Sequence, residues 1–548
     1  MTARFVTVAG AIGAAMLIVM AAAYAITREA SPIIHVRWRA DVGAAERQDR
    51  RQAHALSECS ALDDRTDRCE LLDTSRSNLA AIVGDSTIED TYHLQRSTLT
   101  IATDADLAPR MTWIAYRVPL LRRSGVMQTM VAAVFVLVVG AVVAHVGVSL
   151  NLVLAGVAVV LFGAVTWTTG RIEVNDGMGY DGRQYAAMLQ KGLGAGTPMS
   201  RMRPVVVLLA RIPFYATQDV VRSFELLNYV FAFLLAYLVG ALGDRYGIGK
   251  VAKAYLVVSL ALCIATAKMF AYYPVLIDLG SYVAITAAVY TILVAPRPVA
   301  AFAVCVAVLT REFAIAAALF GLHRDIRQRA GVVRSMLTYA PALLLPFVLR
   351  RFAVSGVAAA GIVDIVRENA GRLNDPLFLG FFGYFLLTTF GGVSLILFAR
   401  IDQWFKVLAK EHEWITFGVV VFAMALLWSF DFWRYIAFLL PLVVVLFATA
   451  SAAWTAREQV WLYAIAAFAT WYTQRPFEHV DLPVYFRDWF PYYVASLGST
   501  PLKRDALWPL WTWRYRAALA FVLILAVSHL WRRRAAGPAR EVAPLASI

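Results

Sequence analysis

The chain has 548 residues, of which 60% are hydrophobic and only 16% are charged, and its mean hydropathy is +0.63. Soluble domains carry about 25% charged residues, so this composition excludes a series of ordinary soluble domains and indicates an integral membrane protein. The net charge of +14 does not indicate nucleic-acid binding, because the basic residues lie in short loops between apolar runs. We therefore expect membrane lipids, and no nucleic acid, among its partners.

The first apolar run covers residues 5–25 and is long enough for one membrane crossing. Ala23-Tyr24-Ala25 resembles a signal-peptidase site, but the run is long for the hydrophobic part of a signal peptide. We favour an uncleaved transmembrane anchor, residues 1–27, over a cleaved signal peptide. Either interpretation places the segment that follows outside the cytoplasm.

Residues 28–124 are the one large polar segment and predict a small α/β domain. Alternating polarity predicts strands at 33–38, at 68–72 and within 89–102, and helical patterns cover 44–56 and 75–83. This β-α-β-α-β order is typical of a ferredoxin-like sandwich, for which we expect a docking role rather than catalysis. Cys59 and Cys69 lie in this domain and form either a disulfide, in an oxidising compartment, or two free thiols.

Residues 125–534 consist mainly of apolar runs, and a polar tail, residues 535–548, follows them. Each run has about the 20 residues that a membrane-spanning helix needs. Counting the first run, we expect an α-helical polytopic membrane protein with about 12 spans and one re-entrant helix pair at 299–322. The later spans are expected at 126–146, 150–169, 224–242, 254–271, 275–294, 336–349, 377–398, 414–429, 435–450, 459–473 and 516–531.

Basic residues predict the orientation of these spans. With the N-terminus in the cytoplasm, the loop that contains Arg245, Lys250 and Lys253 falls inside. The basic clusters in 324–334, 400–410 and 532–534 also fall inside, but only if 299–322 enters and leaves the membrane on the same side. We therefore expect a multi-pass protein of a bacterial inner membrane with both termini in the cytoplasm.

The same topology places the acidic residues at membrane depth, or at its edge, on the outer face. Two of them follow the third span, one begins the sixth, one is at the tip of the re-entrant pair and one begins the span at 435–450. They are Asp176, Asp181, Asp278, Glu312 and Asp431. Ionisable residues at membrane depth are functional candidates by default, so their common level predicts a single pocket.

The strongest motif is Asn175–Tyr185, with the sequence NDGMGYDGRQY. Its Asp-Gly and Gly-Tyr-Asp-Gly steps predict tight turns that aim a carboxylate toward a cavity. Arg183 and Gln184 add hydrogen-bond donors beside it. Further along the chain, Arg201-Met202-Arg203-Pro204 supplies cations that suit a phosphate at the membrane surface.

Several segments resemble the bacterial GT-C fold glycosyltransferases, polytopic enzymes that use polyprenyl-phosphate sugars. They are YDGRQYAAML…RMRPVVVLLARIP…LLNYVFAFLL, YYPVLIDLGSY, LTREFAIAAALF and DFWRYIAFLLPL, within residues 150–450. The resemblance implies transfer of a sugar from a lipid-linked donor to a glycan, lipid or protein acceptor at the outer face. The chain departs from that pattern in the extra span, the soluble domain and the hairpin that precede the aspartate loop.

The resemblance and the chemistry of sugar transfer assign roles to the candidate residues. Asp181 is the expected general base, with Asp176 as the alternative. Asp278 and Glu312 either hold cations in place or, with Asp176, bind a divalent Mg or Mn ion. The cations expected to bind the donor phosphate are Arg203, Arg311, Arg434 and Lys268, and the remaining substrate-binding candidates are Arg183, Gln184 and Asp431.

Two other classes of function are compatible with the sequence. Broken helices and charged residues at membrane depth are also typical of a transporter or flippase of a lipid-linked or amphipathic substrate. The two halves of the chain show no convincing repeat of one another, however, and its acids are expected at one face rather than at the midplane. A non-catalytic scaffold that docks a partner through residues 28–124 is the third class, and it leaves the Asn175–Tyr185 motif unexplained. Aromatic residues in the loop 474–515 are expected to anchor the membrane interface.

Overall fold

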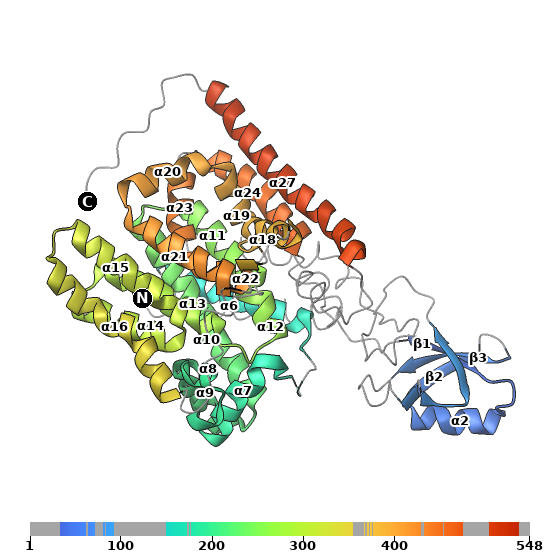
Figure 1. Cartoon of the computed structure of the whole chain (residues 1–548). Helices are drawn as coiled ribbons and strands as arrows, with labels where there is room; N and C mark the ends of the chain where they lie inside the picture. The colour runs from blue at the N-terminus through green and yellow to red at the C-terminus, as the bar shows by residue number, and fades with distance from the viewer. Residues whose placement is uncertain are drawn as a thin grey trace, which may run out of the picture. The chain divides into compact units, whose positions relative to one another are not determined.

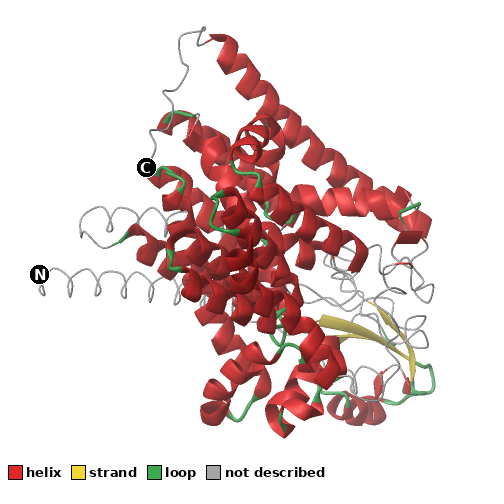
Figure 2. Cartoon of the chain, turned by 60° about the vertical axis from the view of Figure 1, so that its left-hand side comes forward, coloured by secondary structure: helices red, strands yellow, loops and turns green. Residues whose placement is uncertain are grey.

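The structure is a computed structural model. It describes residues 33–61, 64–71, 81–82, 84–92, 149–172, 175, 177–353, 367, 370–371, 373–374, 376–428, 432–452, 454–474 and 504–535. Contacts divide the chain into two compact units, a smaller one that holds the strands and a larger one made of Val143–Pro476 and Trp508–Ile548 (Figure 1). The described part of the larger unit is helical (Figure 2).

The smaller unit contains a four-stranded antiparallel sheet in the order β2-β3-β1-β4. Its elements are β1 (Ile33–Trp38), α2 (Ala44–Ala53), β2 (Leu56–Ala61), β3 (Thr66–Leu71) and β4 (Ile88–Tyr92). This strand order is the one expected for a ferredoxin-like sheet. Strand β2 was not predicted. The predicted helix 44–56 ends early, at Ala53, because Ala55 adopts a left-handed turn with φ of 52° and the chain then enters β2.

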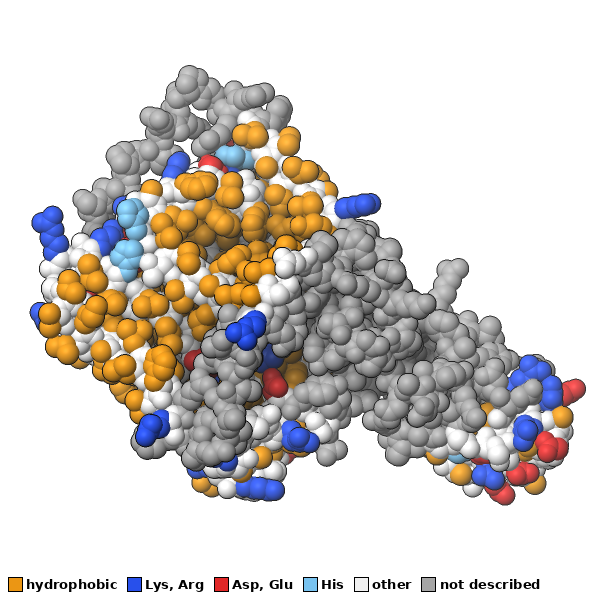
Figure 3. Space-filling model, viewed as in Figure 1, with side chains coloured by type: hydrophobic (Ala, Val, Ile, Leu, Met, Phe, Trp, Pro, Cys, Tyr) orange, Lys and Arg blue, Asp and Glu red, His pale blue; other side chains and the backbone are white. Residues whose placement is uncertain are grey.

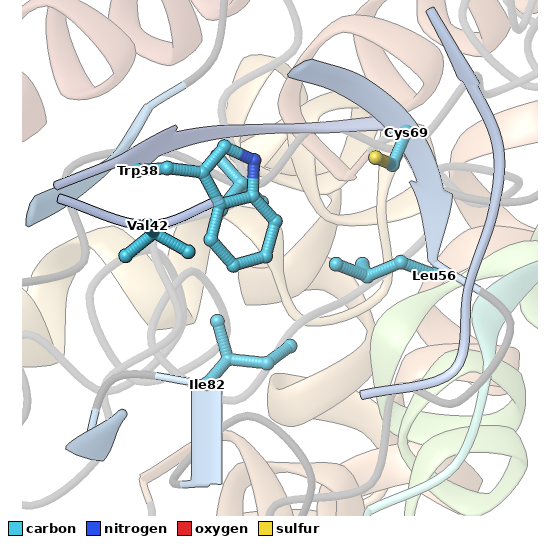
Figure 4. Packing of buried hydrophobic residues seen from close by; sticks show 6 residues of the cluster. Trp38, Val42, Leu56, Cys69 and Ile82 are labelled. Atoms are coloured by element: carbon cyan, nitrogen blue, oxygen red, sulfur yellow. The ribbon is translucent and has the colours of Figure 1, made fainter. Parts of the chain in front are cut away.

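A small apolar core packs under this sheet (Figure 4). It is formed by Val36, Trp38, Val42, Leu56, Cys69 and Ile82, which are all buried. Cys59 and Cys69 form a disulfide that joins β2 to β3, so the structure supports the first of the two alternatives for these cysteines. A core of so few residues gains from such a cross-link, because a disulfide restricts the unfolded chain.

The larger unit has four helices long and apolar enough to cross a membrane. They are α6 (Leu150–Thr169), α10 (Val220–Arg245), α16 (Val332–Ala353) and the helical segment Arg434–Ala452. The number is six if each of two bent pairs counts as one span, and five shorter apolar helices accompany them. These counts cover only the described residues, and the predicted spans 5–25 and 126–146 lie outside them.

The other helices and turns of this unit follow in chain order. They are α7 (Gly179–Lys191), η1 (Leu193–Ala195), α8 (Pro198–Arg201), α9 (Pro204–Thr217), α11 (Lys250–Leu262), η2 (Ile264–Lys268), α12 (Met269–Tyr272), α13 (Asp278–Val294), α14 (Arg297–Thr310), η3 (Glu312–Ala314), α15 (Ile315–Arg327), α18 (Pro376–Thr388), α19 (Gly392–Ala399), α20 (Ile401–Lys410), α21 (Glu413–Trp428), α22 (Phe432–Ile436), η4 (Ala437–Leu439), α23 (Leu440–Ala452), α24 (Ala456–Gln474) and α27 (Arg504–Ala535).

Large apolar side chains are exposed over much of the helical unit. Figure 3 shows hydrophobic side chains over much of the described part of the visible face of this unit, with many of the Lys and Arg side chains toward its edges. Among the most exposed are Ile212, Phe302, Leu337, Phe347 and Leu523, which belong to four different helices. An apolar surface of this extent is unfavourable in water and suits contact with lipid. Together with the long apolar helices, it indicates a multi-pass membrane protein.

Two of the predicted spans are broken. The predicted span 377–398 consists of α18 and α19 at an angle of 100°, with Gly391 between them at φ of 57°. The predicted span 254–271 bends by 51° after Leu262. Gln474 on α24 serves both breaks, since its Oε1 accepts from the N–H of Ile264 at 2.6 Å and its amide group donates to the carbonyl of Thr388. Such partners are required where a helix is interrupted in an apolar environment.

Helices α14 and α15 form a hairpin. Nε of Arg297, at the start of α14, donates to Oδ2 of Asp325, near the end of α15, at 2.9 Å. The tip of the hairpin is therefore Arg311-Glu312, where the chain leaves α14 and enters η3. This doubling back is the geometry predicted for the pair at 299–322.

The predicted cytoplasmic loops meet at the other end of α15. The hydroxyl of Tyr246 donates to Oε2 of Glu411 at 2.7 Å, and Nη1 of Arg327 donates to the carbonyl of Lys410 at 2.9 Å. Three of the regions that the charge pattern places on one side of the membrane are thus in contact. A helix of 13 residues is about 20 Å long, so these loops and the hairpin tip are separated by most of the thickness of an apolar layer.

Candidate functional site

A buried carboxylate lies at the start of α13. Asp278 has no exposed surface, and each of its oxygens accepts a hydrogen bond from a different arginine. Nη2 of Arg434 on α22 donates to Oδ2 at 2.8 Å, and Nη1 of Arg311 at the hairpin tip donates to Oδ1. Burial of an ion is unfavourable unless its charge is compensated and its lone pairs are satisfied, and here two guanidinium groups do both.

The second neighbour of Arg434 is Asp181, in the first turn of α7. Nη1 of Arg434 lies 3.4 Å from Oδ2 of Asp181. The side chain of Asp181 is 53% exposed, whereas that of Arg434 is 6% exposed. The ion pairs therefore lead from the buried Asp278 to a carboxylate that solvent can reach.

A second pair adjoins the first, because Glu312 follows Arg311 in the chain. Nε of Arg203 donates to Oε2 of Glu312 at 2.9 Å, and its Nη2 donates to Oε1, so the pair is bidentate. Arg203 immediately precedes α9, and its Nη1 also donates to the hydroxyl of Tyr185 at 3.4 Å. We call the six residues Asp181, Asp278, Glu312, Arg203, Arg311 and Arg434 the charged cluster. With three carboxylates and three guanidinium groups, its formal charge is zero.

Aromatic residues of α22, η4 and α13 line the charged cluster. The hydroxyl of Tyr435 accepts from Nη2 of Arg311 at 2.9 Å, and the guanidinium carbon of Arg311 lies 5.0 Å from the centre of the Tyr435 ring. The hydroxyl of Tyr282 donates to the backbone carbonyl of Arg434 at 2.8 Å. These contacts orient the two arginines that bind Asp278. Sequence reasoning missed both tyrosines, and the only signal for Tyr435 was its place directly after Arg434.

Turns at the start of α7 set the place of Asp181. Asn175 and Gly177 have positive φ values of 54° and 80°, and the side-chain amide of Asn175 donates to the carbonyl of Gly179 at 2.8 Å. The predicted tight turns are therefore present. They are followed at once by α7, whose first turn carries Asp181.

The remaining predicted residues lie in different places. Arg183 is exposed on α7, and Gln184 on the same helix accepts from the hydroxyl of Thr197 at 2.5 Å. Lys268 is buried at the end of η2. Asp176 and Asp431 lie outside the described residues.

The described residues do not fit a divalent cation at the charged cluster. Both oxygens of Asp278 and both oxygens of Glu312 accept hydrogen bonds from arginines. Hard cations need several oxygen ligands, and the part of the chain that the structure describes has no group of three or more Asp, Glu, His or Cys side chains that could hold a metal ion. We therefore assign no chemical step to a metal.

Comparisons with protein-family models, with curated proteins and with solved structures found no match for this chain. The geometry of the charged cluster is therefore what a function must explain. It offers an accessible carboxylate next to a guanidinium group, in a unit made of largely apolar helices.

Proposed function

We propose that the chain is a glycosyltransferase of the GT-C kind, which transfers a sugar from a polyprenyl-phosphate donor to an acceptor at the outer face of a bacterial inner membrane. The observation that carries this proposal is the half-exposed carboxylate of Asp181, 3.4 Å from Arg434, beside the buried pair of arginines on Asp278. Transfer from a sugar phosphate needs a base for the acceptor and a cation for the leaving phosphate, side by side.

The reaction forms one bond and breaks one. The acceptor hydroxyl oxygen attacks the anomeric carbon, while the bond from that carbon to the phosphate oxygen breaks. Asp181 takes the hydroxyl proton, and the polyprenyl phosphate leaves with the bonding electrons. Arg434, supported by Arg203 and Arg311, stabilises the negative charge that develops on the phosphate.

Donor binding also frees the base. The contact of 3.4 Å between Arg434 and Asp181 is long for a charge-assisted hydrogen bond, which is usually about 2.7–2.9 Å. The phosphodiester anion of the donor would compete for the same Nη1 group and release the carboxylate toward the acceptor. Asp278 and Glu312 meanwhile hold the guanidinium groups in place, as one of the two sequence hypotheses for these acids proposed.

The proposed arrangement in the membrane has about 12 spans, both termini in the cytoplasm and the strand-containing unit outside. The Cys59–Cys69 disulfide supports the outside position, because disulfides persist in oxidising compartments. The contacts among the basic loops, at the end of α15 away from the hairpin tip, support the orientation. The charged cluster then lies at the outer face, where a lipid-linked sugar and a glycan, lipid or protein acceptor meet.

Broken helices favour a second candidate, a transporter or flippase of a lipid-linked or amphipathic substrate. Interrupted helices line substrate sites in many transporters, and this chain has bends of 51° and 100° in two of its spans. Gln474 binds backbone groups at both breaks, which ties them together. A transporter would move the lipid-linked substrate across the membrane without covalent change.

The first test compares the wild type with Asp181→Asn after purification in mild detergent. We expect mass spectrometry to find a polyprenyl-phosphate sugar retained by the variant and consumed by the wild type, and we expect transfer to fall by about 10²–10⁴-fold, the usual contribution of a general base. Asp64→Asn is the matched control, because Asp64 is exposed in the smaller unit.

Full transfer activity in Asp181→Asn would remove Asp181 from the role of base. Ordinary phospholipids alone, equal in the three proteins, would favour the transporter or the scaffold. Movement of a labelled polyprenyl-phosphate sugar across vesicle membranes that contain the protein, without formation of a sugar-transfer product, would then identify the transporter. Loss of a bound partner on deletion of residues 28–124 would identify the scaffold.

A further inference from the structure

The two glycines around Asp181 leave room for neighbouring side chains. Gly179 has φ of 67°, and a Cβ atom on it would overlap the ring of Tyr273. A Cβ atom on Gly182 would lie 2.9 Å from Cβ of Val275, closer than real Cβ atoms approach. The Gly-Tyr-Asp-Gly step is therefore a packing requirement as well as a turn, since it lets the segment with Tyr273 and Val275 lie against the first turn of α7.

Tyr273 uses this close approach to make a hydrogen bond. Its hydroxyl accepts from the backbone N–H of Gly182 at 2.9 Å in a buried position. Gly182 lies in the first turn of α7, and the hydroxyl gives its N–H a partner from outside the helix. The tyrosine thus takes the place of a helix cap for the residue that directly follows Asp181.

Tyr273 is itself held on both sides. The carbonyl of Tyr272 accepts from the N–H of Ile172 at 2.8 Å, and the carbonyl of Pro274 accepts from the side-chain amide of Asn228 at 2.9 Å. The same short stretch of chain leads into α13, which begins at Asp278. One fixed segment therefore contacts the turn that carries Asp181 and also supplies the carboxylate that holds Arg311 and Arg434.

We propose that Tyr273 is a positioning residue for Asp181, whose hydroxyl fixes the first turn of α7 so that the carboxylate faces Arg434. The proposal rests on the proposed function, in which Asp181 is the base. A misplacement of a base by a fraction of an ångström lowers the rate of the chemical step, because proton transfer depends on the approach of the reacting atoms. Donor binding depends on the arginines, which Tyr273 does not contact through its hydroxyl.

The test is Tyr273→Phe, which removes the hydroxyl and keeps the ring. We expect kcat for sugar transfer to fall about three- to tenfold, the equivalent of one hydrogen bond, with KM for the donor unchanged. Tyr255→Phe is the matched control, since the hydroxyl of Tyr255 is also buried and has no hydrogen-bond partner in the described part of the chain. We expect no change in kcat there.

Hydrogen–deuterium exchange of residues 177–185 gives a readout that needs no activity. We expect faster exchange in Tyr273→Phe and wild-type exchange in Tyr255→Phe. Gly182→Ala should also speed exchange, because its Cβ forces Val275 away while the tyrosine hydroxyl is still present. Unchanged exchange in Tyr273→Phe, or equal losses in kcat and donor binding, would overturn the proposal. If even the wild type transfers no sugar, the proposed function fails, and the exchange rates still decide whether Tyr273 fixes this turn.

Discussion

Among the described residues of the helical unit, two carboxylates have no exposed surface, and each binds two arginines. Asp278 lies by the hairpin tip, and Glu413 lies at the start of α21, near the opposite end of α15. Around Glu413 both cations come from the last turns of α15: Arg324 at 3.2 Å and Arg327 at 2.7 Å. These ion pairs join α15 to α21, and within the described residues neither arginine is paired with a further carboxylate, so we call Glu413, Arg324 and Arg327 a structural clasp.

Around Asp278 the same ion-pair chemistry has a different outcome. Its arginines come from separate elements, and Arg434 continues to the half-exposed Asp181. The difference teaches that a buried ion pair is not itself a sign of function, since such pairs are neutral or weakly stabilising as often as not. What distinguishes the ion pairs of Asp278 from those of Glu413 is that Arg434 has a further partner, Asp181, which a ligand can replace.

The largest expected effect is on stability, in Asp278→Asn. The change removes the negative charge that compensates the buried Arg311 and leaves one acceptor oxygen for two guanidinium groups, and an uncompensated buried charge costs about 3–5 kcal/mol. In Glu413→Gln the cost should be about 1–3 kcal/mol, because Arg327 is 36% exposed and can be hydrated. Chemical denaturation in mild detergent measures both. Equal losses would show that solvent access does not distinguish the two carboxylates.

Transfer activity should also distinguish the charged cluster from the clasp at the other end of α15. Arg434→Lys should lower transfer at least tenfold and raise KM for the donor, because one ammonium group cannot replace two guanidinium nitrogens that bind two carboxylates. Arg327→Lys should change neither by more than about twofold, since the described partners of Arg327, Glu413 and the carbonyl of Lys410, do not belong to the charged cluster. Initial rates over a range of donor concentrations test both. A large effect of Arg327→Lys would mean that the clasp also supports the reaction.

Much of the charged cluster could be predicted because charges are rare in apolar runs. Asp278, Glu312 and Arg311 stand out from their neighbours in the sequence, and counting spans placed them at one level. Their tyrosine partners could not be predicted, because tyrosine is common in this chain and its hydroxyl matters only once the fold provides a partner. Tyr273 is an example: its partner is a backbone N–H of Gly182, on an element far away in the sequence.

The fold could be predicted where the local sequence pattern determines the structure, and not where a side chain from a distant part of the chain determines it. The hairpin at 299–322 was indicated by the charges at its tip. The break in 377–398 depends on Gln474 and Thr470, which bind the freed backbone groups from another helix. Strand β2 was missed for a local reason, since the left-handed turn at Ala55 is not a preference of alanine.

A third buried carboxylate, Asp85 in the smaller unit, extends the comparison to pH. Asp85 lies 2.7 Å from Nε2 of His54 and accepts hydrogen bonds from the N–H and hydroxyl of Thr87 at 2.9 and 2.6 Å. Burial raises the pKa of Asp85, but the hydrogen bonds from Thr87 and His54 and the charge of Arg50 outweigh it and hold the pKa below its usual 3.8.

A carboxyl group with a lowered pKa stabilises the folded state above its unfolded pKa, and this contribution is lost as the pH falls through the folded value. Residues 84–92 should therefore be protected from hydrogen–deuterium exchange at pH 5 and less protected at pH 3, after correction for intrinsic exchange rates. The effect should be the smallest of the set, about 1 kcal/mol for one or two hydrogen bonds. Asp85→Asn should show the low protection expected for the wild type at pH 3, and should show it at both pH values, because asparagine is uncharged at both. Equal protection of the wild type at pH 3 and pH 5 would mean that the ionised carboxyl group of Asp85 does not stabilise the smaller unit.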